Sequence, residues 1–141
     1  MGAPEIVGPE ESAFAQVLAE LLRFIKEQKI RNVVWVTADV HYASATHYRP
    51  EIARFADFDP FWEFVGGAIN AGTFGPGEID KTFGPDVKLV SIPTDMKQNR
   101  SPMDGLQFFG IGRIDSRTKA MKVSLHGIDG PPLFTVELPP E

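Results

Sequence analysis

Asp39 and His41 stand two positions apart, directly after the apolar run 33–36. Just past a strand end, where the chain turns, alternate side chains can converge on one point. Here they would offer a carboxylate oxygen and an imidazole nitrogen to a divalent metal ion, a mixture that suits zinc, manganese or iron better than calcium alone. In the alternative interpretation, Asp39 caps a turn and His41 packs against Trp35 or Tyr42. Two ligands alone do not complete a metal site.

The other two histidines, His47 and His126, are weaker candidates for a functional site. His47 lies six residues beyond His41 in an expected loop, where it is either a contact to substrate or to a metal ligand, or a surface histidine. His126 shares an expected strand face with Lys122 and Ser124, so we expect it to face solvent. No Gly-x-Ser-x-Gly motif and no glycine-rich phosphate loop occurs, and the absence of cysteine excludes a catalytic thiol and thiolate zinc sites.

An amphipathic helix is expected ahead of the Asp-x-His pair. Residues 1–9 have the composition of an irregular lead-in, and Pro9, Glu10 and Glu11 are typical of a first helical turn. The helix needs a sheet to lie on, because its apolar residues recur every three or four positions over about five turns. These residues are Phe14, Val17, Leu18, Leu21, Leu22 and Ile25.

The run 33–36 is expected to be a strand buried on both faces, because it is continuously apolar rather than alternating. Such a strand is typical of the centre of an α/β sheet, whose ligands bind at the carboxyl edge. Asp39 and His41 would lie at that edge. The pattern therefore predicts an α/β, or mixed α+β, fold class with a single domain over residues 1–141.

The rest of the chain predicts loops and strands. Residues 42–60 and 71–85 have loop compositions, and the second of these ranges carries two similar Thr-Phe-Gly-Pro turns that we expect to be structural. The chain should end in an antiparallel meander with one solvated face, since Met121, Val123 and Leu125 alternate with polar residues. The expected strands cover residues 61–65, 87–92, 106–114, 121–125 and 133–138.

Charge and composition argue against nucleic acid and membranes as binding partners. The chain has 141 residues and a formal net charge of −5, and its 14 basic residues are scattered along the sequence. This distribution predicts no basic patch that would bind nucleic acid or an anionic membrane. No apolar run is long enough to span a bilayer, and the amino terminus lacks the pattern of an export signal.

Five motifs together resemble a known family. They are Asn-Val-Val-Trp-Val-Thr-Ala-Asp-Val-His-Tyr at 32–42, Phe-Trp-Glu-Phe-Val-Gly-Gly at 61–67, Ala-Gly-Thr-Phe-Gly-Pro at 71–76, Thr-Phe-Gly-Pro at 82–85 and Gly-Leu-Gln-Phe-Phe-Gly at 105–110. In order and spacing they resemble the carboxyl-terminal part of the alkaline phosphatase D (PhoD-like) family of metallophosphatases. The resemblance implies a phosphomonoesterase or phosphodiesterase with the calcineurin-like metallophosphoesterase fold, a double β-sandwich flanked by helices that holds a dinuclear metal centre.

The resemblance also implies a role for the Asp-x-His pair. Ala38-Asp39-Val40-His41 is similar to the last metal motif of the superfamily, Gly-His-x-His, with aspartate in place of the first histidine. The superfamily also opens with Asp-x-His, but an opening motif is followed by Gly-Asp-x-x-Asp and Gly-Asn-His, and neither follows here. Asp39 and His41 are therefore expected to be metal ligands, with Tyr42 and His47 as neighbours only.

Most ligands of a two-metal centre would then lie outside this chain. We expect a carboxyl-terminal portion of a phosphoric ester hydrolase that is inactive alone, with zinc, manganese, iron or calcium bound as a dinuclear centre only when the upstream half is present. Its partners would be a phosphate ester and either the amino-terminal half or a second copy. Family members are commonly exported, which suggests a periplasmic or extracellular location. The alternative is a non-catalytic β-rich binding module on the same scaffold.

Overall fold

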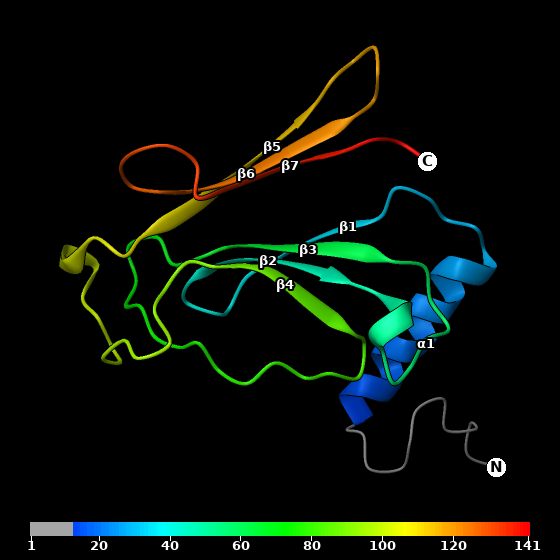
Figure 1. The fold of residues 1–141 in the computed structure, drawn as a ribbon, viewed down its shortest axis with the longest axis horizontal. Coiled ribbons are helices and arrows are strands. Elements are labelled where there is room, and N and C mark those ends of the chain that lie inside the picture. Colours follow the sequence, from blue (N-terminus) through cyan, green and yellow to red (C-terminus); the bar gives the residue numbers. More distant parts are fainter. Residues whose placement is uncertain (1–12) are drawn as a thin grey trace.

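The computed structural model describes residues 13–141, and its elements form three layers (Figure 1). The expected lead-in and helix start, residues 1–9 and Pro9 to Glu11, lie outside the described residues. One helix and two sheets in the described range confirm the mixed α/β class. The elements are α1 (Ala13–Glu27), β1 (Val34–Thr37), β2 (Ala43–Tyr48), the 3-10 helix η1 (Pro50–Ile52), β3 (Phe61–Gly66), β4 (Pro85–Val90), the 3-10 helix η2 (Pro102–Asp104), β5 (Phe108–Ile114), β6 (Met121–Gly127) and β7 (Phe134–Leu138).

The middle layer is a four-stranded sheet in the order β1-β3-β2-β4. β1 runs parallel to β3, and β2 runs antiparallel to both β3 and β4. The three-stranded antiparallel sheet β5-β6-β7 lies over one face, which confirms the predicted meander, and α1 lies against the other face (Figure 1). Within residues 13–141, no helix is long and apolar enough to cross a membrane.

Alternating side chains divide the core between the two faces of the middle sheet. On the α1 face, Phe55, Phe58, Phe61 and Phe83 form a buried cluster whose rings meet largely edge to face. Such aromatic pairs add about 0.5–1.5 kcal/mol each beyond the area they bury. On the meander face, small and large apolar residues interleave in a second cluster that includes Ala43, Ala45, Phe64, Phe108, Val123 and Leu125.

The position of β1 differs from the prediction. A strand is present at Val34–Thr37, but it lies at the edge of the sheet, with β3 as its neighbour. The Val36 side chain is 76% exposed, so the expectation of a central strand buried on both faces is wrong. An unbroken apolar run predicts burial only when another layer or strand covers each side, and none of the described residues pairs with the outer edge of β1.

β2 was not predicted, because residues 42–60 have the composition of a loop. The strand lies in the middle of the sheet between β3 and β4. Its inward residues Ala43 and Ala45 are fully buried, yet their small side chains carry almost no hydrophobic signal. They must be small because Val123 and Leu125 of the meander pack over them.

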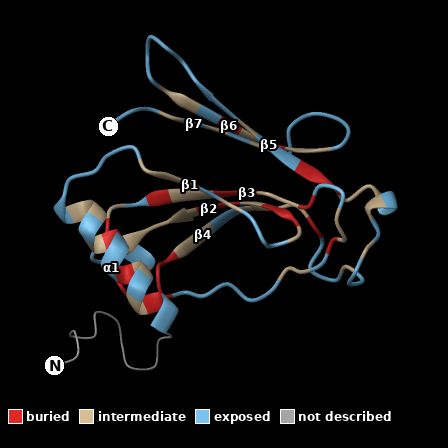
Figure 2. Cartoon of the chain, turned by 180° about the vertical axis from the view of Figure 1, so that it is seen from behind, coloured by how far each residue is buried: buried red, intermediate tan, exposed pale blue. Residues whose placement is uncertain are grey.

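The buried face of α1 also differs from the prediction. Figure 2 shows the helix with buried residues on one side and exposed residues on the other. Ala15, Ala19 and Leu22 are the buried residues, with Leu18 packed beside them. The expectation that Phe14, Val17 and Leu21 face the sheet is wrong, since Phe14 is 83% exposed. The alanines allow the helix to approach the phenylalanine cluster more closely than a row of bulky residues would.

Candidate metal centre

Asp39 lies in a strained turn just past the carboxyl end of β1. Its φ is +77°, and the N–H of Val40 donates to the carbonyl of Ala38 over 3.0 Å. This is a γ-turn of the positive-φ type, which is rare for residues other than glycine. Aspartate tolerates the left-handed region better than most residues. The turn leaves the Asp39 side chain exposed, so its carboxylate oxygens are accessible to a cation.

His41 is held in one orientation by the loop that follows β3. Its Nδ1 atom hydrogen-bonds to the carbonyl oxygen of Gly72, and its ring lies 4.3 Å from the ring of Phe74, tilted by 32°. A carbonyl oxygen can only accept, so Nδ1 must carry the hydrogen. The neutral ring then has its lone pair on Nε2. Metal-binding histidines in proteins are commonly oriented by such a bond from the other ring nitrogen.

The segment that presents Gly72 and Phe74 is itself anchored by Thr73. Thr73 is fully buried, its Oγ1 donates to the carbonyl of Leu106 over 2.6 Å, and its backbone exchanges two hydrogen bonds with Arg100. The structural role that we expected for the first Thr-Phe-Gly-Pro turn is thus observed, and the turn also orients His41. Sequence reasoning missed Gly72, because a backbone carbonyl acts without any side-chain signal.

The second Thr-Phe-Gly-Pro turn has a separate role in the core. Phe83 belongs to the phenylalanine cluster, and the buried Thr82 donates both its hydroxyl and its backbone N–H to Asp80, each over 2.7 Å. These hydrogen bonds, with the nearby Arg54, hold the pKa of Asp80 below its usual value. This turn therefore supports the fold rather than His41.

A carboxylate on β3 connects the end of β1 to β2. Glu63 accepts a hydrogen bond of 2.7 Å from Thr37 Oγ1 and one of 3.0 Å from the Tyr48 hydroxyl. Burial, reinforced by the negative charge of Glu63, raises the pKa of Tyr48, so the phenol stays protonated as a donor. Burial also raises the pKa of Tyr42, which is 8% exposed.

Comparison with known families identifies the family of this chain. A family model described as PhoD-like phosphatase matches residues 9–125, which is most of the chain. The chain belongs to the PhoD-like phosphatase family. Comparisons with curated proteins and with solved structures find no match.

PhoD-like phosphatases are generally metal-dependent, and the donors of Asp39 and His41 fit a metal ion. A carboxylate oxygen and the free Nε2 of an oriented imidazole are both common ligands of first-row transition metals. Within residues 13–141, no group of three or more His, Cys, Asp or Glu residues is arranged to hold a metal. Among the described residues, no third His, Cys, Asp or Glu joins Asp39 and His41 as a candidate ligand.

His47 lies elsewhere in this PhoD-like phosphatase. It is in register with Trp62, which in turn pairs with Val34 at the start of β1, whereas Asp39 and His41 follow the other end of that strand. The structure does not bring His47 together with the Asp-x-His pair. Its ring stacks on Trp62 at 4.7 Å, and burial, together with the positive charge of Arg49, lowers its pKa.

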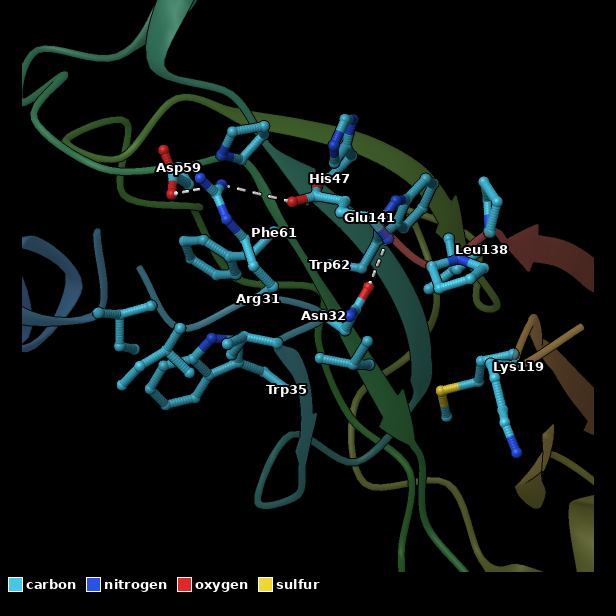
Figure 3. Close-up of a pocket in the computed structure, with 18 of the residues that line it drawn as sticks. Arg31, Asn32, Trp35, His47, Asp59, Phe61, Trp62, Lys119, Leu138 and Glu141 are labelled. Atoms are coloured by element: carbon cyan, nitrogen blue, oxygen red, sulfur yellow. Dashed lines mark hydrogen bonds and ion pairs between the residues drawn. The ribbon is translucent and has the colours of Figure 1, made fainter. Parts of the chain in front are cut away.

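A cavity of about 430 Å³ lies at the same end of the sheet as His47 (Figure 3). Trp62 and Leu138 form part of its wall, and Arg31 and Asn32, which also line it, both contact Glu141. Its volume falls in the range of small-molecule pockets in proteins. Arg31 is paired with Asp59 and Glu141, so its charge is compensated within the chain.

The third histidine was predicted to face solvent and is instead partly covered. The ring of His126 stacks on Phe109 at 4.9 Å, and its Nε2 hydrogen-bonds to Ser124 Oγ over 2.8 Å. Both partners lie on the outer face of the meander. His126 therefore has no contact with the Asp-x-His pair.

Proposed function

We propose that this chain is part of a metal-dependent phosphoric ester hydrolase acting on phosphomonoesters or phosphodiesters, to which Asp39 and His41 contribute the last metal-ligand motif. One observation carries the proposal. The Nδ1 hydrogen of His41 is engaged by Gly72, which leaves Nε2 to carry the lone pair, two positions after the exposed Asp39 at a strand end in a PhoD-like phosphatase.

The chain's own residues would hold and orient the metal ion. Asp39 supplies a negative oxygen ligand, and the Gly72 carbonyl keeps the His41 ring in the tautomer that binds through Nε2. Phe74 covers one face of that ring and limits its rotation. A bound divalent metal supplies Lewis acidity, which polarises the phosphoryl group and lets water attack near neutral pH.

The remaining ligands would come from a further segment, either an upstream half or a second copy. Two features support this part of the proposal. The outer edge of β1 pairs with no strand among the described residues, and α1 exposes an apolar stripe of Phe14, Val17, Leu21 and Phe24. Open strand edges and exposed apolar stripes are typical of surfaces that another polypeptide covers.

Manganese binding by the chain as it stands tests the ligand assignment. Isothermal titration and the paramagnetic broadening of the His41 ring signals should both report Mn²⁺ binding near Asp39. We expect Asp39→Ala and His41→Ala to weaken binding by at least about tenfold, while Asp129→Ala, at an exposed aspartate of the meander, leaves it unchanged. If both site variants bind Mn²⁺ as the wild type does, the assignment is wrong.

A second experiment tests the completing segment. If the reading frame upstream of Met1 encodes Gly-Asp-x-x-Asp and Gly-Asn-His, adding that segment should produce hydrolysis of p-nitrophenyl phosphate or of its diester. The activity should disappear in Asp39→Ala and His41→Ala. Self-association is settled by the mass of the chain in solution, because a second copy would double it.

A non-catalytic binding module is the second candidate. The observation that favours it is the cavity of about 430 Å³ at the opposite end of the sheet from Asp39 and His41. A module would be a compact monomer whose core amides resist hydrogen exchange without metal. The carboxyl-terminal portion of a larger enzyme would instead self-associate through the exposed apolar stripe of α1. Size-exclusion chromatography with hydrogen exchange separates these outcomes.

A further inference from the structure

Glu63 occupies a central place among the side chains on the α1 face of the sheet. On β3 it is in register with Trp35 of β1 on one side and with Thr46 of β2 on the other. Its carboxylate is half-buried, and its two oxygens accept separately from Thr37 and Tyr48. Among the described residues, no lysine, arginine or histidine lies within ion-pair distance of Glu63. The carboxylate is therefore held by hydroxyl groups alone.

The end of β1 has few other contacts. Val36 is 76% exposed and Val40 is 38% exposed, and the strand has one neighbour in the described sheet. In the described part of the chain, the side chains of residues 36–40 make one hydrogen bond to another segment, from Thr37 to Glu63. Together with the backbone pairing of Thr37 with Val65 on β3, this bond anchors the chain upstream of the turn that contains Asp39.

Asp39 needs such an anchor because of its backbone conformation. A non-glycine residue at a φ of +77° is strained, and strained residues persist only where the surroundings hold the chain on both sides. Downstream of Asp39, the bond from His41 to Gly72 and the burial of Tyr42 fix the chain. Upstream, β1 pairs with β3 as far as Thr37, and the Thr37–Glu63 bond adds a side-chain constraint at that last paired residue.

We propose that Glu63 is a positioning residue: through Thr37 it holds Asp39 in its γ-turn, and so it sets the affinity of the Asp-x-His pair for metal. The affinity part of this inference rests on the proposed function. The backbone part concerns the metal-free chain and stands independently of it.

Tyr48 offers a matched control. Its hydroxyl bonds the other oxygen of Glu63, but Tyr48 is on β2 and stacks on Phe61 at 4.7 Å, in the core under α1. Thr37→Val and Tyr48→Phe each remove one hydroxyl that bonds the same carboxylate and keep the shape of the side chain. If Glu63 served stability alone, the two variants would behave alike.

The first arm of the experiment uses the metal-free chain and nuclear magnetic resonance. In Thr37→Val we expect the amide and Cα signals of Asp39 and Val40 to move, as the γ-turn is lost in part of the population. In Tyr48→Phe these signals should stay in place although the melting temperature falls. Thr37→Ser restores the hydroxyl and should return the signals to their wild-type positions. Should Thr37→Val not fold, Thr37→Ala removes the same hydroxyl.

The second arm measures the affinity for Mn²⁺. Thr37→Val should weaken binding about tenfold, as loss of a group that orients a metal ligand commonly does, and Thr37→Ser and Tyr48→Phe should bind close to the wild type. Unmoved Asp39 and Val40 signals in Thr37→Val, or equal movement in Tyr48→Phe, overturns the inference.

The two proposals fail in different ways. If Asp39→Ala leaves Mn²⁺ affinity unchanged, the ligand assignment is wrong, while the metal-free spectra still decide whether Glu63 positions Asp39. If Asp39→Ala weakens binding and Thr37→Val does not, the role of Glu63 in setting affinity is wrong and the proposed function stands.

Discussion

His41 donates the hydrogen of its Nδ1 atom to the carbonyl oxygen of Gly72, which lies 31 positions later in the chain. This bond joins the turn after β1 to the loop after β3. The loop in turn is fixed by the fully buried Thr73. The Nε2 atom of His41 is thus oriented by a loop that is distant in the sequence.

The tautomer of His41 is the first prediction. The neutral ring should carry its hydrogen on Nδ1, because the Gly72 carbonyl can only accept. Long-range ¹⁵N–¹H correlation spectra of the ring distinguish the two tautomers. In free histidine the hydrogen on Nε2 is the more common form, so a majority of that form at His41 would contradict the bond. His126 provides an internal comparison in the same spectrum.

Gly84→Ala should destabilise the fold. A Cβ atom at Gly84 would lie 2.3 Å from the carbonyl oxygen of Arg49 and 2.8 Å from the nitrogen of Ala53, and the φ of +60° is itself unfavourable for alanine. We expect the free energy of unfolding to fall by at least about 2 kcal/mol. Gly77→Ala is the control, since its Cβ would meet nothing within 4 Å. Urea unfolding of both variants measures the difference, and equal stabilities would contradict the close approach at Gly84.

The orientation of α1 predicts opposite results for two apolar residues. Leu22 is 3% exposed, so Leu22→Ala should lower the free energy of unfolding by about 2–5 kcal/mol. Phe14 is 83% exposed, and Phe14→Ala should change it by less than about 0.5 kcal/mol in the monomer. Chemical unfolding at low protein concentration makes the comparison. A large loss in Phe14→Ala would show that this stripe of the helix is covered.

The pKa of Asp80 predicts a loss of stability in acid. Hydrogen bonds from Thr82, aided by Arg54, lower this pKa below the ordinary value of 3.8. Between the lowered pKa and 3.8 the unfolded chain binds more protons than the folded one, so stability falls as the pH decreases through this window. The contribution is fully present above about pH 5.

Asp80→Asn isolates the charge, because its amide oxygen can still accept from Thr82. The wild type should be more stable than this variant near neutral pH, and the difference should shrink below pH 3.8. Urea unfolding from pH 2 to pH 7 is the measurement. A difference that does not vary with pH would mean that the charge contributes nothing.

Much of the fold could be predicted because its signals are local. The alternation of Met121, Val123 and Leu125 identified a strand of the meander, and the run before Asp39 identified a strand end. β2 could not be predicted, since Ala43 and Ala45 are buried because of what packs over them. The helix α1 was predicted, but its buried face was not, because α1 carries two adjacent apolar stripes. The choice between them depends on phenylalanines between residues 55 and 83.

The candidate site was predictable only in part. The spacing of Asp39 and His41 drew attention to them, and the structure places both residues just beyond β1. The constraints on them come from Gly72 and Glu63, which lie far away in sequence and whose roles depend on a backbone carbonyl and on two hydroxyl partners. Neither role leaves a pattern in the sequence.

The edge position of β1 has a thermodynamic consequence. A segment that added a strand to the outer edge of β1 would restrict the same backbone that carries Asp39. Strand addition and metal binding would then both favour the same ordered conformation of this backbone. Linkage then requires the coupling to be reciprocal: if the added strand raises metal affinity by some factor, bound metal raises the affinity for the strand by the same factor. Metal ions would thus act as an assembly signal for this sheet.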